Sequence, residues 1–161
     1  MTINAKQFAQ QVVIPTLEWL DRMASIPYSD AAFYLVMGTI AQESLLGTYL
    51  VQEDGPALGI GQVEPATLDD LLTRLSGAEK SALALLAAPT TPAHNVVANL
   101  PYAVAVTRLL YWKVPEPLPQ PPTVTALFGY YKAHYNTAAG AATLSQFMQN
   151  WALTGLDLPL S

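Results

Sequence analysis

Residues 29–44, SDAAFYLVMGTIAQES, predict a helix that is buried on every side. Ser29 followed by Asp30 is a typical helix start, because a serine oxygen can accept a hydrogen bond from an amide of the first turn. From residue 31 to residue 41 the stretch offers only Thr39 as a polar side chain. A helix that is apolar all round must lie at the centre of a domain, with other helices packed around it.

Helical patterns before and after this stretch predict the elements that surround it. A first helix is expected over residues 5–23, with Pro15 kinking or restarting it. After a loop or small hairpin over residues 47–61, we expect a helix with Thr67 as its N-cap and with Asp69 and Asp70 in its first turn. Further helices are expected over residues 78–87, over 91–112 with a break near Pro101, over 123–136 and over 141–151.

The whole chain, residues 1–161, is expected to form one all-α domain. The stretch VPEPLPQPP, residues 114–122, predicts a stiff extended connector. Residues 123–161 are too few to hold a core of their own, so we expect them to pack back onto the earlier helices.

Composition excludes several classes of function. The chain has 161 residues, of which 52% are hydrophobic and 12% charged, so it has enough apolar surface for a sizeable core and for a partner. A net charge of −5 disfavours nucleic acid as a partner. With no cysteine and two histidines we expect no metal site and no cofactor. The richest apolar run, residues 31–41, is too short to cross a bilayer, which takes about 20 residues. No secretory signal is recognisable at the start, so synthesis in a cytoplasm is expected.

Glu43 is the first candidate for chemistry. It ends the predicted buried helix on the same stripe as Val36 and Ile40. A carboxyl beside an apolar stripe loses hydration, so its pKa rises and it can serve as a proton donor near neutral pH. The alternative is a structural acid that caps the helix or pairs with an arginine, and for Glu43 taken alone we favour that alternative. The candidate partners are Arg22, Arg74 and Arg108.

Two further segments suggest a ligand site near Glu43. The glycine-rich stretch GPALGIG, residues 55–61, would let a ligand approach the backbone and is followed by Gln62 and Glu64. Later, FGYYKAHYNTAAG gathers aromatic rings and amide groups that suit the faces and hydroxyls of a sugar. The alternative for this second segment is a tyrosine-rich apolar helix. Its polar and aromatic members are Tyr130, Tyr131, His134, Tyr135 and Asn136.

In this order, the motifs resemble those of the lysozyme-like superfamily, which includes lytic transglycosylases and goose-type lysozymes. The matching segments are ESLLG at 43–47, GPALGIGQVEPAT at 55–67, NV at 95–96, HYNTAAGAA at 134–142 and Trp151. The family's Gly-Leu-Met-Gln block reads Gly-Ile-Gly-Gln in this chain, the Tyr-Asn block continues Thr-Ala-Ala-Gly, and the proline-rich connector is an addition.

The resemblance implies a lysozyme-like fold and cleavage of the β-1,4 bond between N-acetylmuramic acid and N-acetylglucosamine in peptidoglycan strands. Glu43 takes the place of the general acid. The implied substrate contacts are Ser44, Gly59, Gln62, Tyr135 and Asn136. Without a secretion signal or wall-binding repeat, the chain resembles bacteriophage lysins or virion-borne wall-degrading proteins, made in the host cytoplasm and acting on the cell wall.

Two routes could complete the reaction. Glu64, which matches an acid of the goose-type lysozymes, could activate a water across a gap of about 6.5 to 9.5 Å, giving hydrolysis with inversion. Glu53 and Asp54 are second choices. Alternatively, the muramic acid's own acetamide and hydroxyl could give a 1,6-anhydro product, with Glu64 merely supporting the start of the next helix.

A competing reading places the chain in another class of protein. High apolar content and few charges also suit a virion structural or adaptor protein that keeps the lysozyme-like fold without cleaving anything. Such a protein would have an assembly partner in the particle.

Overall fold

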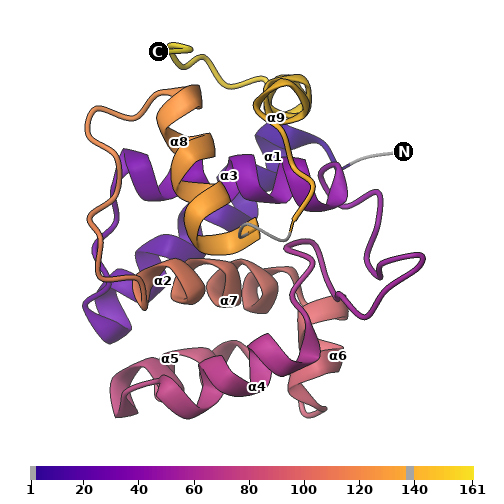
Figure 1. Ribbon diagram of the computed structural model, residues 1–161. Coiled ribbons are helices and arrows are strands. Elements are labelled where there is room, and N and C mark those ends of the chain that lie inside the picture. The colour runs from indigo at the N-terminus through magenta and orange to yellow at the C-terminus, as the bar shows by residue number, and fades with distance from the viewer. Residues whose placement is uncertain (1–2, 137–139) are drawn as a thin grey trace.

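The computed structural model describes residues 3–136 and 140–161 and shows the predicted all-α fold (Figure 1). Its helices are α1 (Ala5–Phe8), α2 (Ile14–Ala24), α3 (Asp30–Ser44), α4 (Pro65–Arg74), α5 (Gly77–Leu86), α6 (Pro92–Ala98), α7 (Leu100–Trp112), α8 (Val124–Tyr131) and α9 (Leu144–Trp151). These residues also form π-helical turns at Ala9–Val13 and Lys132–Asn136 and a 3-10 turn at Ala152–Thr154.

The central helix predicted from residues 29–44 is confirmed as α3. The Ser29 hydroxyl accepts a hydrogen bond of 3.1 Å from the amide of Ala32. Every residue from 35 to 41 is buried, and α3 packs against α7, α8 and α9 (Figure 1). The apolar sequence of α3 thus reflects contacts on all of its sides.

Gly38 allows α9 to approach α3 closely. A Cβ atom added there would lie 2.9 Å from Cζ of Phe147 and 3.1 Å from the ring of Trp151, both on α9. Real Cβ atoms essentially never come closer than about 3 Å to another heavy atom, so α9 sits where it does because residue 38 has no side chain.

The N-terminal helix restarts near Pro15, as predicted, through a wider turn. The π-helical turn Ala9–Val13 joins α1 to α2, and the Ile14 amide hydrogen-bonds the carbonyl of Ala9. Pro15 lies in the first turn of α2 and has no N–H to donate to a carbonyl of the preceding turn, which is where the α-helical hydrogen-bond pattern gives way to the π-helical turn.

The predicted start of α4 is wrong by three residues. Its N-cap is Glu64 rather than Thr67, and Pro65 takes the first helical position. Proline favours that position because its fixed φ already suits a helix. Asp69 and Asp70 therefore lie beyond the first turn, and Asp70 pairs with Arg74 at 2.8 Å on the exposed face.

The segment between α3 and α4 is a loop with isolated β-bridges rather than a regular hairpin. Val51 pairs with Leu58, and Leu58 pairs with Val63 through two N–H···O bonds of 2.9 Å. The break predicted near Pro101 is also confirmed. Asn99 ends α6 and caps α7 by accepting a hydrogen bond from the amide of Tyr102.

The C-terminal residues pack back onto the earlier helices. Leu127 and Tyr131 of α8 and Phe147 of α9 share a buried cluster with Leu35 of α3 and Tyr111 of α7. The last helix begins at Leu144, three residues later than the predicted residue 141. Its start is fixed by the reciprocal capping of Thr143 and Gln146. Within the described residues, no helix is both long enough and apolar enough to cross a bilayer.

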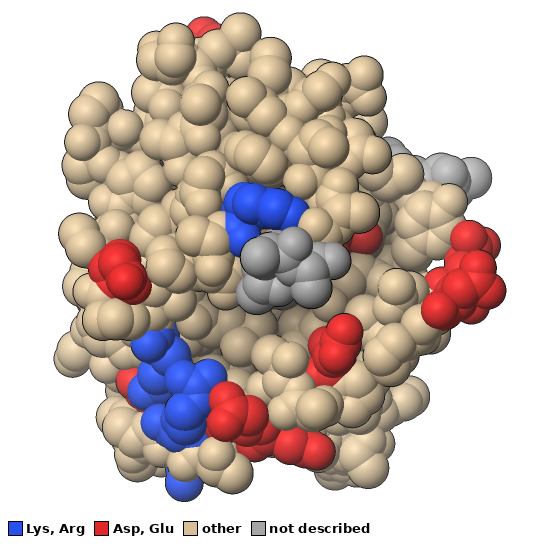
Figure 2. Space-filling view, viewed as in Figure 1, with Lys and Arg blue, Asp and Glu red and all other residues tan. Residues whose placement is uncertain are grey.

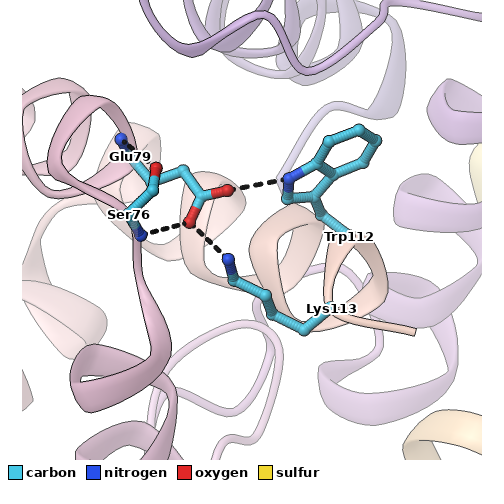
Figure 3. Close-up of polar contacts among 4 residues, drawn as sticks. All are labelled: Ser76, Glu79, Trp112 and Lys113. Atoms are coloured by element: carbon cyan, nitrogen blue, oxygen red, sulfur yellow. Dashed lines mark hydrogen bonds and ion pairs between the residues drawn. The ribbon is translucent and has the colours of Figure 1, made fainter. Parts of the chain in front are cut away.

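A buried carboxylate ties α5 to the end of α7 (Figure 3). Glu79 accepts hydrogen bonds from the Ser76 amide at 2.8 Å, from Nε1 of Trp112 at 2.8 Å and from Nζ of Lys113. Burial by itself would raise the pKa of Glu79, but the hydrogen bonds from Lys113, Ser76 and Trp112 outweigh it and hold the pKa below its ordinary value. Lys113 also lines the cleft described next, so this contact fixes part of its wall.

Candidate functional site

A cleft of about 950 Å³ gathers the C-terminal end of α3, the α3–α4 loop, α4, the end of α7 and the π-helical turn after α8. Figure 2 shows a hollow near the middle of this face, with acidic side chains at its lower and right-hand margins and a basic group at the lower left. Its charged and polar lining residues include Glu43, Gln52, Glu53, Asp54, Gln62, Glu64, Arg74, Lys113, His134, Tyr135 and Asn136.

Glu43 ends α3 at this cleft and is half-buried. The hydroxyl of Tyr131 donates a hydrogen bond of 2.6 Å to its Oε1 atom. Burial raises the pKa of Glu43 to about 7, although the hydrogen bond from Tyr131 acts in the opposite direction. The carboxyl can therefore carry a proton at neutral pH and release it to an acceptor in the cleft.

Two of the arginine partners considered for Glu43, Arg74 and Arg108, are engaged elsewhere. Arg74 pairs with Asp70, and the guanidinium of Arg108 lies 5.7 Å from the ring centre of Trp112. Among the described residues Glu43 forms no ion pair, so the alternative of an arginine-paired structural acid is wrong.

Ser44 lies beside Glu43 in the chain but not in the cleft lining. It is fully buried, and its hydroxyl donates to the Ile40 carbonyl at 3.1 Å and accepts from the Gly47 amide at 3.0 Å. These bonds hold the left-handed turn in which Leu45, Leu46 and Gly47 have φ values of 49°, 51° and 77°. Ser44 thus shapes the end of α3 instead of offering its hydroxyl to a ligand.

Gly59 and Gln62 shape a tight turn, and only Gln62 lines the cleft. Gly59 has a φ of 74°, and a Cβ atom there would lie 2.3 Å from the carbonyl oxygen of Val96. Gln62 also adopts a left-handed conformation, with φ of 47°, and its Nε2 donates to the Gly59 carbonyl at 2.8 Å. Gly59 is therefore required by the backbone and by contact with Val96.

Tyr135 fastens the π-helical turn to this glycine turn. Its hydroxyl donates a hydrogen bond of 2.6 Å to the carbonyl of Gly61. A Cβ atom on Gly61 would lie 2.5 Å from Oγ1 of Thr107 and 2.8 Å from the Tyr135 hydroxyl, so only glycine fits. The rings of Tyr131 and Tyr135 stack with their centres 6.1 Å apart.

Asn136 lines the cleft next to Tyr135, and its Oδ1 accepts a hydrogen bond of 2.8 Å from Lys132. Residues 137–139 of the HYNTAAGAA block lie outside the described residues. Glu64 is exposed on the cleft at the start of α4, and Glu53 and Asp54 are exposed on the loop beside it.

The structure thus brings Glu43, Gln62, Glu64, Tyr135 and Asn136 to one cleft and leaves the side chains of Ser44 and Gly59 out of its lining. Sequence reasoning missed the hydrogen bond from Tyr131 to Glu43, the close packing at Gly61 and the hydrogen bond from Lys132 to Asn136. The four-residue spacing of Tyr131 and Tyr135 was a usable signal, since it predicts a shared helix face.

Chemically, the cleft offers a protonated carboxyl, amide and phenol groups and further carboxylates, which together suit acid-catalysed cleavage of a bond to oxygen. Comparison of the chain with protein-family models, with curated proteins and with solved structures finds no match.

Proposed function

We propose that this chain is a lysozyme-like, cofactor-independent glycosidase that cleaves the β-1,4 bond between N-acetylmuramic acid and N-acetylglucosamine in peptidoglycan. One observation carries the proposal: Glu43 is half-buried at a polar cleft, accepts a hydrogen bond from Tyr131 and has its pKa raised to about 7. A carboxyl with this pKa is a suitable general acid near neutral pH.

In the proposed reaction, Glu43 gives its proton to the glycosidic oxygen as the bond from that oxygen to C1 breaks. The resulting oxocarbenium ion is then trapped in one of two ways. In hydrolysis, Glu64 takes a proton from a water that attacks C1. In transglycosylation, the sugar's own 6-hydroxyl attacks C1, and the Glu43 carboxylate takes the hydroxyl proton.

The remaining lining residues fit a glycan ligand. Asn136 and Gln62 supply amide groups at the cleft, and Tyr135 supplies an aromatic ring that is already fixed to the Gly61 carbonyl. Such groups can hydrogen-bond sugar hydroxyls and acetamides and cover an apolar sugar face.

Glu43→Gln tests the proposal, because it keeps the size and the hydrogen-bond acceptor of the side chain but removes the transferable proton. We expect folded protein, checked by circular dichroism, that no longer releases soluble muropeptides from purified cell walls. Retained release would exclude Glu43 as the acid.

The products separate the two routes. A 1,6-anhydro end is one water lighter than a reducing end, so mass spectrometry of the muropeptides distinguishes them. If the products have reducing ends and Glu64→Ala keeps full activity, the role of Glu64 as base is wrong.

A second candidate is a virion adaptor that keeps the fold without catalysis. It is favoured by consecutive exposed apolar side chains on the α3–α4 loop: Tyr49, Leu50 and Val51 are 39%, 41% and 51% exposed. Light scattering after size-exclusion chromatography would show a ring or other stable oligomer for an adaptor, and a monomer for a free enzyme.

A further inference from the structure

Lys132 is the first residue of the π-helical turn, and its ammonium group hydrogen-bonds other residues of the same segment. Its Nζ donates to Oδ1 of Asn136 at 2.8 Å and to the carbonyl of Gly140 at 2.5 Å. The side chain is half-buried, and within the described residues it forms no ion pair with a carboxylate. Its charge is therefore directed at an amide oxygen and a backbone carbonyl.

The side chain of Asn136 lies between Lys132 and Tyr131 and interacts with both. Because Oδ1 of Asn136 already accepts from Lys132, the amide nitrogen is the group left to donate to the hydroxyl of Tyr131, and the Asn136 side chain acts to lower the pKa of that phenol against the larger effect of burial. The hydroxyl of Tyr131 in turn donates to Oε1 of Glu43 at 2.6 Å. The ammonium of Lys132 is thus connected to the carboxyl of Glu43 through two hydrogen bonds and the Asn136–Tyr131 interaction between them.

Gly140 leaves no spare room behind the amide. A Cβ atom added at residue 140 would lie 2.1 Å from Oδ1 of Asn136. The orientation of the amide is thus set by Lys132 on one side and by the backbone of Gly140 on the other.

We propose that Lys132 is a positioning residue for Glu43 and acts on it through Asn136 and Tyr131 as one hydrogen-bonded chain. A cation on the amide oxygen makes the amide N–H a stronger donor. That stronger bond makes the phenol O–H a stronger donor to the carboxylate, because consecutive hydrogen bonds polarise one another. These contacts also fix Oε1 of Glu43 as the oxygen that accepts the hydrogen bond from the phenol, leaving Oε2 to carry the transferable proton.

The other titratable groups around Glu43 do not take over the effect of Lys132, Asn136 and Tyr131 on its carboxyl. Tyr111 of α7, Tyr131 and Tyr135 face Glu43, and burial, together with the charge of Glu43, raises the pKa of each phenol well above its ordinary value. They stay protonated while Glu43 titrates. The remaining titratable and charged groups that line the cleft are Tyr49, Glu53, Asp54, Glu64, Arg74, Lys113 and His134.

This proposal rests on the proposed function in one respect only: the proposed reaction is what gives the proton of Glu43 a role. It predicts a property of the carboxyl itself, which can be measured without substrate. Absence of wall cleavage would therefore overturn the proposed function and leave the hydrogen-bonded chain to be judged by its own measurement.

The test is a pH titration of the full chain labelled with ¹³C at the glutamate carboxyls, with the Glu43 signal assigned by its loss in Glu43→Gln. Lys132→Met keeps the aliphatic stem and removes the ammonium, and Lys80→Met, on the exposed face of α5, is the matched control. We expect Lys132→Met to lower the acid dissociation constant of Glu43 by about threefold or more, because the donor to the carboxylate is weakened. Lys80→Met is expected to leave the acid dissociation constant of Glu43 unchanged. Lys132→Arg, which keeps a positive charge, is expected to bring that constant close to its wild-type value.

Asn136→Ala leaves the ammonium in place and interrupts the chain at its middle, so it decides the question even if Lys132→Met does not fold. The same direction of change is expected, and the double variant Lys132→Met/Asn136→Ala should shift the constant no further than the larger single effect, since both act through one path. An unchanged constant in Asn136→Ala, or single effects that simply add in the double variant, would overturn the proposal.

Discussion

At the scale of single residues, Glu43 experiences two opposing influences. Burial raises its pKa to about 7, while the hydrogen bond from Tyr131 favours the charged form. The cleft therefore keeps an acid that is about half protonated at neutral pH and still has a fixed donor for its conjugate base. This combination suits a group that must give up a proton and take one back.

The raised pKa also predicts how stability depends on pH. The folded chain holds the Glu43 proton up to about pH 7, whereas an unperturbed glutamate loses it near 4.5. Between these values the folded state binds more protons than the unfolded state, so this group's contribution to stability is lost as pH rises from about 4.5 to 7. Glu43→Gln should be as stable as the wild type at pH 4 and more stable at pH 8, by about 1 to 3 kcal/mol.

Urea unfolding at pH 4, 6 and 8 measures this difference. Glu64→Gln, at an exposed carboxyl of the same cleft, is the matched control and should show no comparable gain at pH 8. Parallel pH curves for Glu43→Gln and the wild type would contradict the burial of Glu43.

At the scale of helices, the contact of α3 with α9 depends on the absence of a side chain at Gly38. Gly38→Ala places a methyl group 2.9 Å from Phe147, so we expect a loss of about 1 to 3 kcal/mol from overpacking. Gly129→Ala, at an exposed position of α8 with nothing within 4 Å of the added methyl, should instead gain about 0.5 to 1 kcal/mol from helix propensity. Thermal unfolding of both variants checks the pair, and equal shifts of the same sign would rule out close packing at Gly38.

The sequence predicted those helices whose signals are local. The apolar run after Ser29 was sufficient to predict α3, and Pro101 was sufficient to predict the break before α7. The predicted start of α4 is wrong because Thr67 is a typical N-cap residue, whereas in the structure the ring of Pro65 fixes the first helical turn.

The candidate site could be predicted only in part, for a physical reason. Glu43 was found from its place on an apolar stripe. Its partner Tyr131 is 88 residues away, and the contact of Tyr135 with Gly61 spans 74 residues. Periodicity reports which face of a helix is apolar but not which distant side chain packs against it.

At the scale of the whole molecule, α7 lies between two groups of helices. Its residue Tyr111 belongs to the buried cluster of α8 and α9, and its residue Leu109 belongs to the cluster that includes α4 and α5 (Figure 1). The cleft is lined from both groups, so its shape depends on how α4 and α5 are held against α7. The contacts of Glu79 with Trp112 and Lys113 provide that link.

Glu79→Ala should therefore cost much more stability than loss of an exposed pair. Removing the carboxylate leaves the Lys113 ammonium with a half-buried charge, and we expect a cost of about 3 to 5 kcal/mol. Asp70→Ala, which breaks the exposed pair with Arg74, should cost less than about 1 kcal/mol. Denaturant unfolding at pH 7 compares the two.

The contribution of Glu79 to folding stability depends on pH in the opposite direction to that of Glu43. Because the folded pKa of Glu79 is lowered, its contribution is present above the ordinary glutamate pKa and is lost as pH falls through the lowered value. The gap in stability between wild type and Glu79→Ala should thus narrow in acid. A gap that is constant with pH would mean that the charge of Glu79 does not matter.

The π-helical turn Lys132–Asn136 makes the cleft sensitive to chain length as well as to side-chain chemistry. A turn closed over five residues accommodates one residue more than an α-helical turn. Deleting a single residue there would let α8 continue as a regular helix and would rotate everything after the deletion by about 100°. The Tyr135 phenol that now meets the glycine turn, and the Asn136 amide that follows it, would then face elsewhere, although no contacting residue had been replaced. Homologous proteins could therefore gain or lose this site through one codon's insertion or deletion, a change that alanine scanning would never sample.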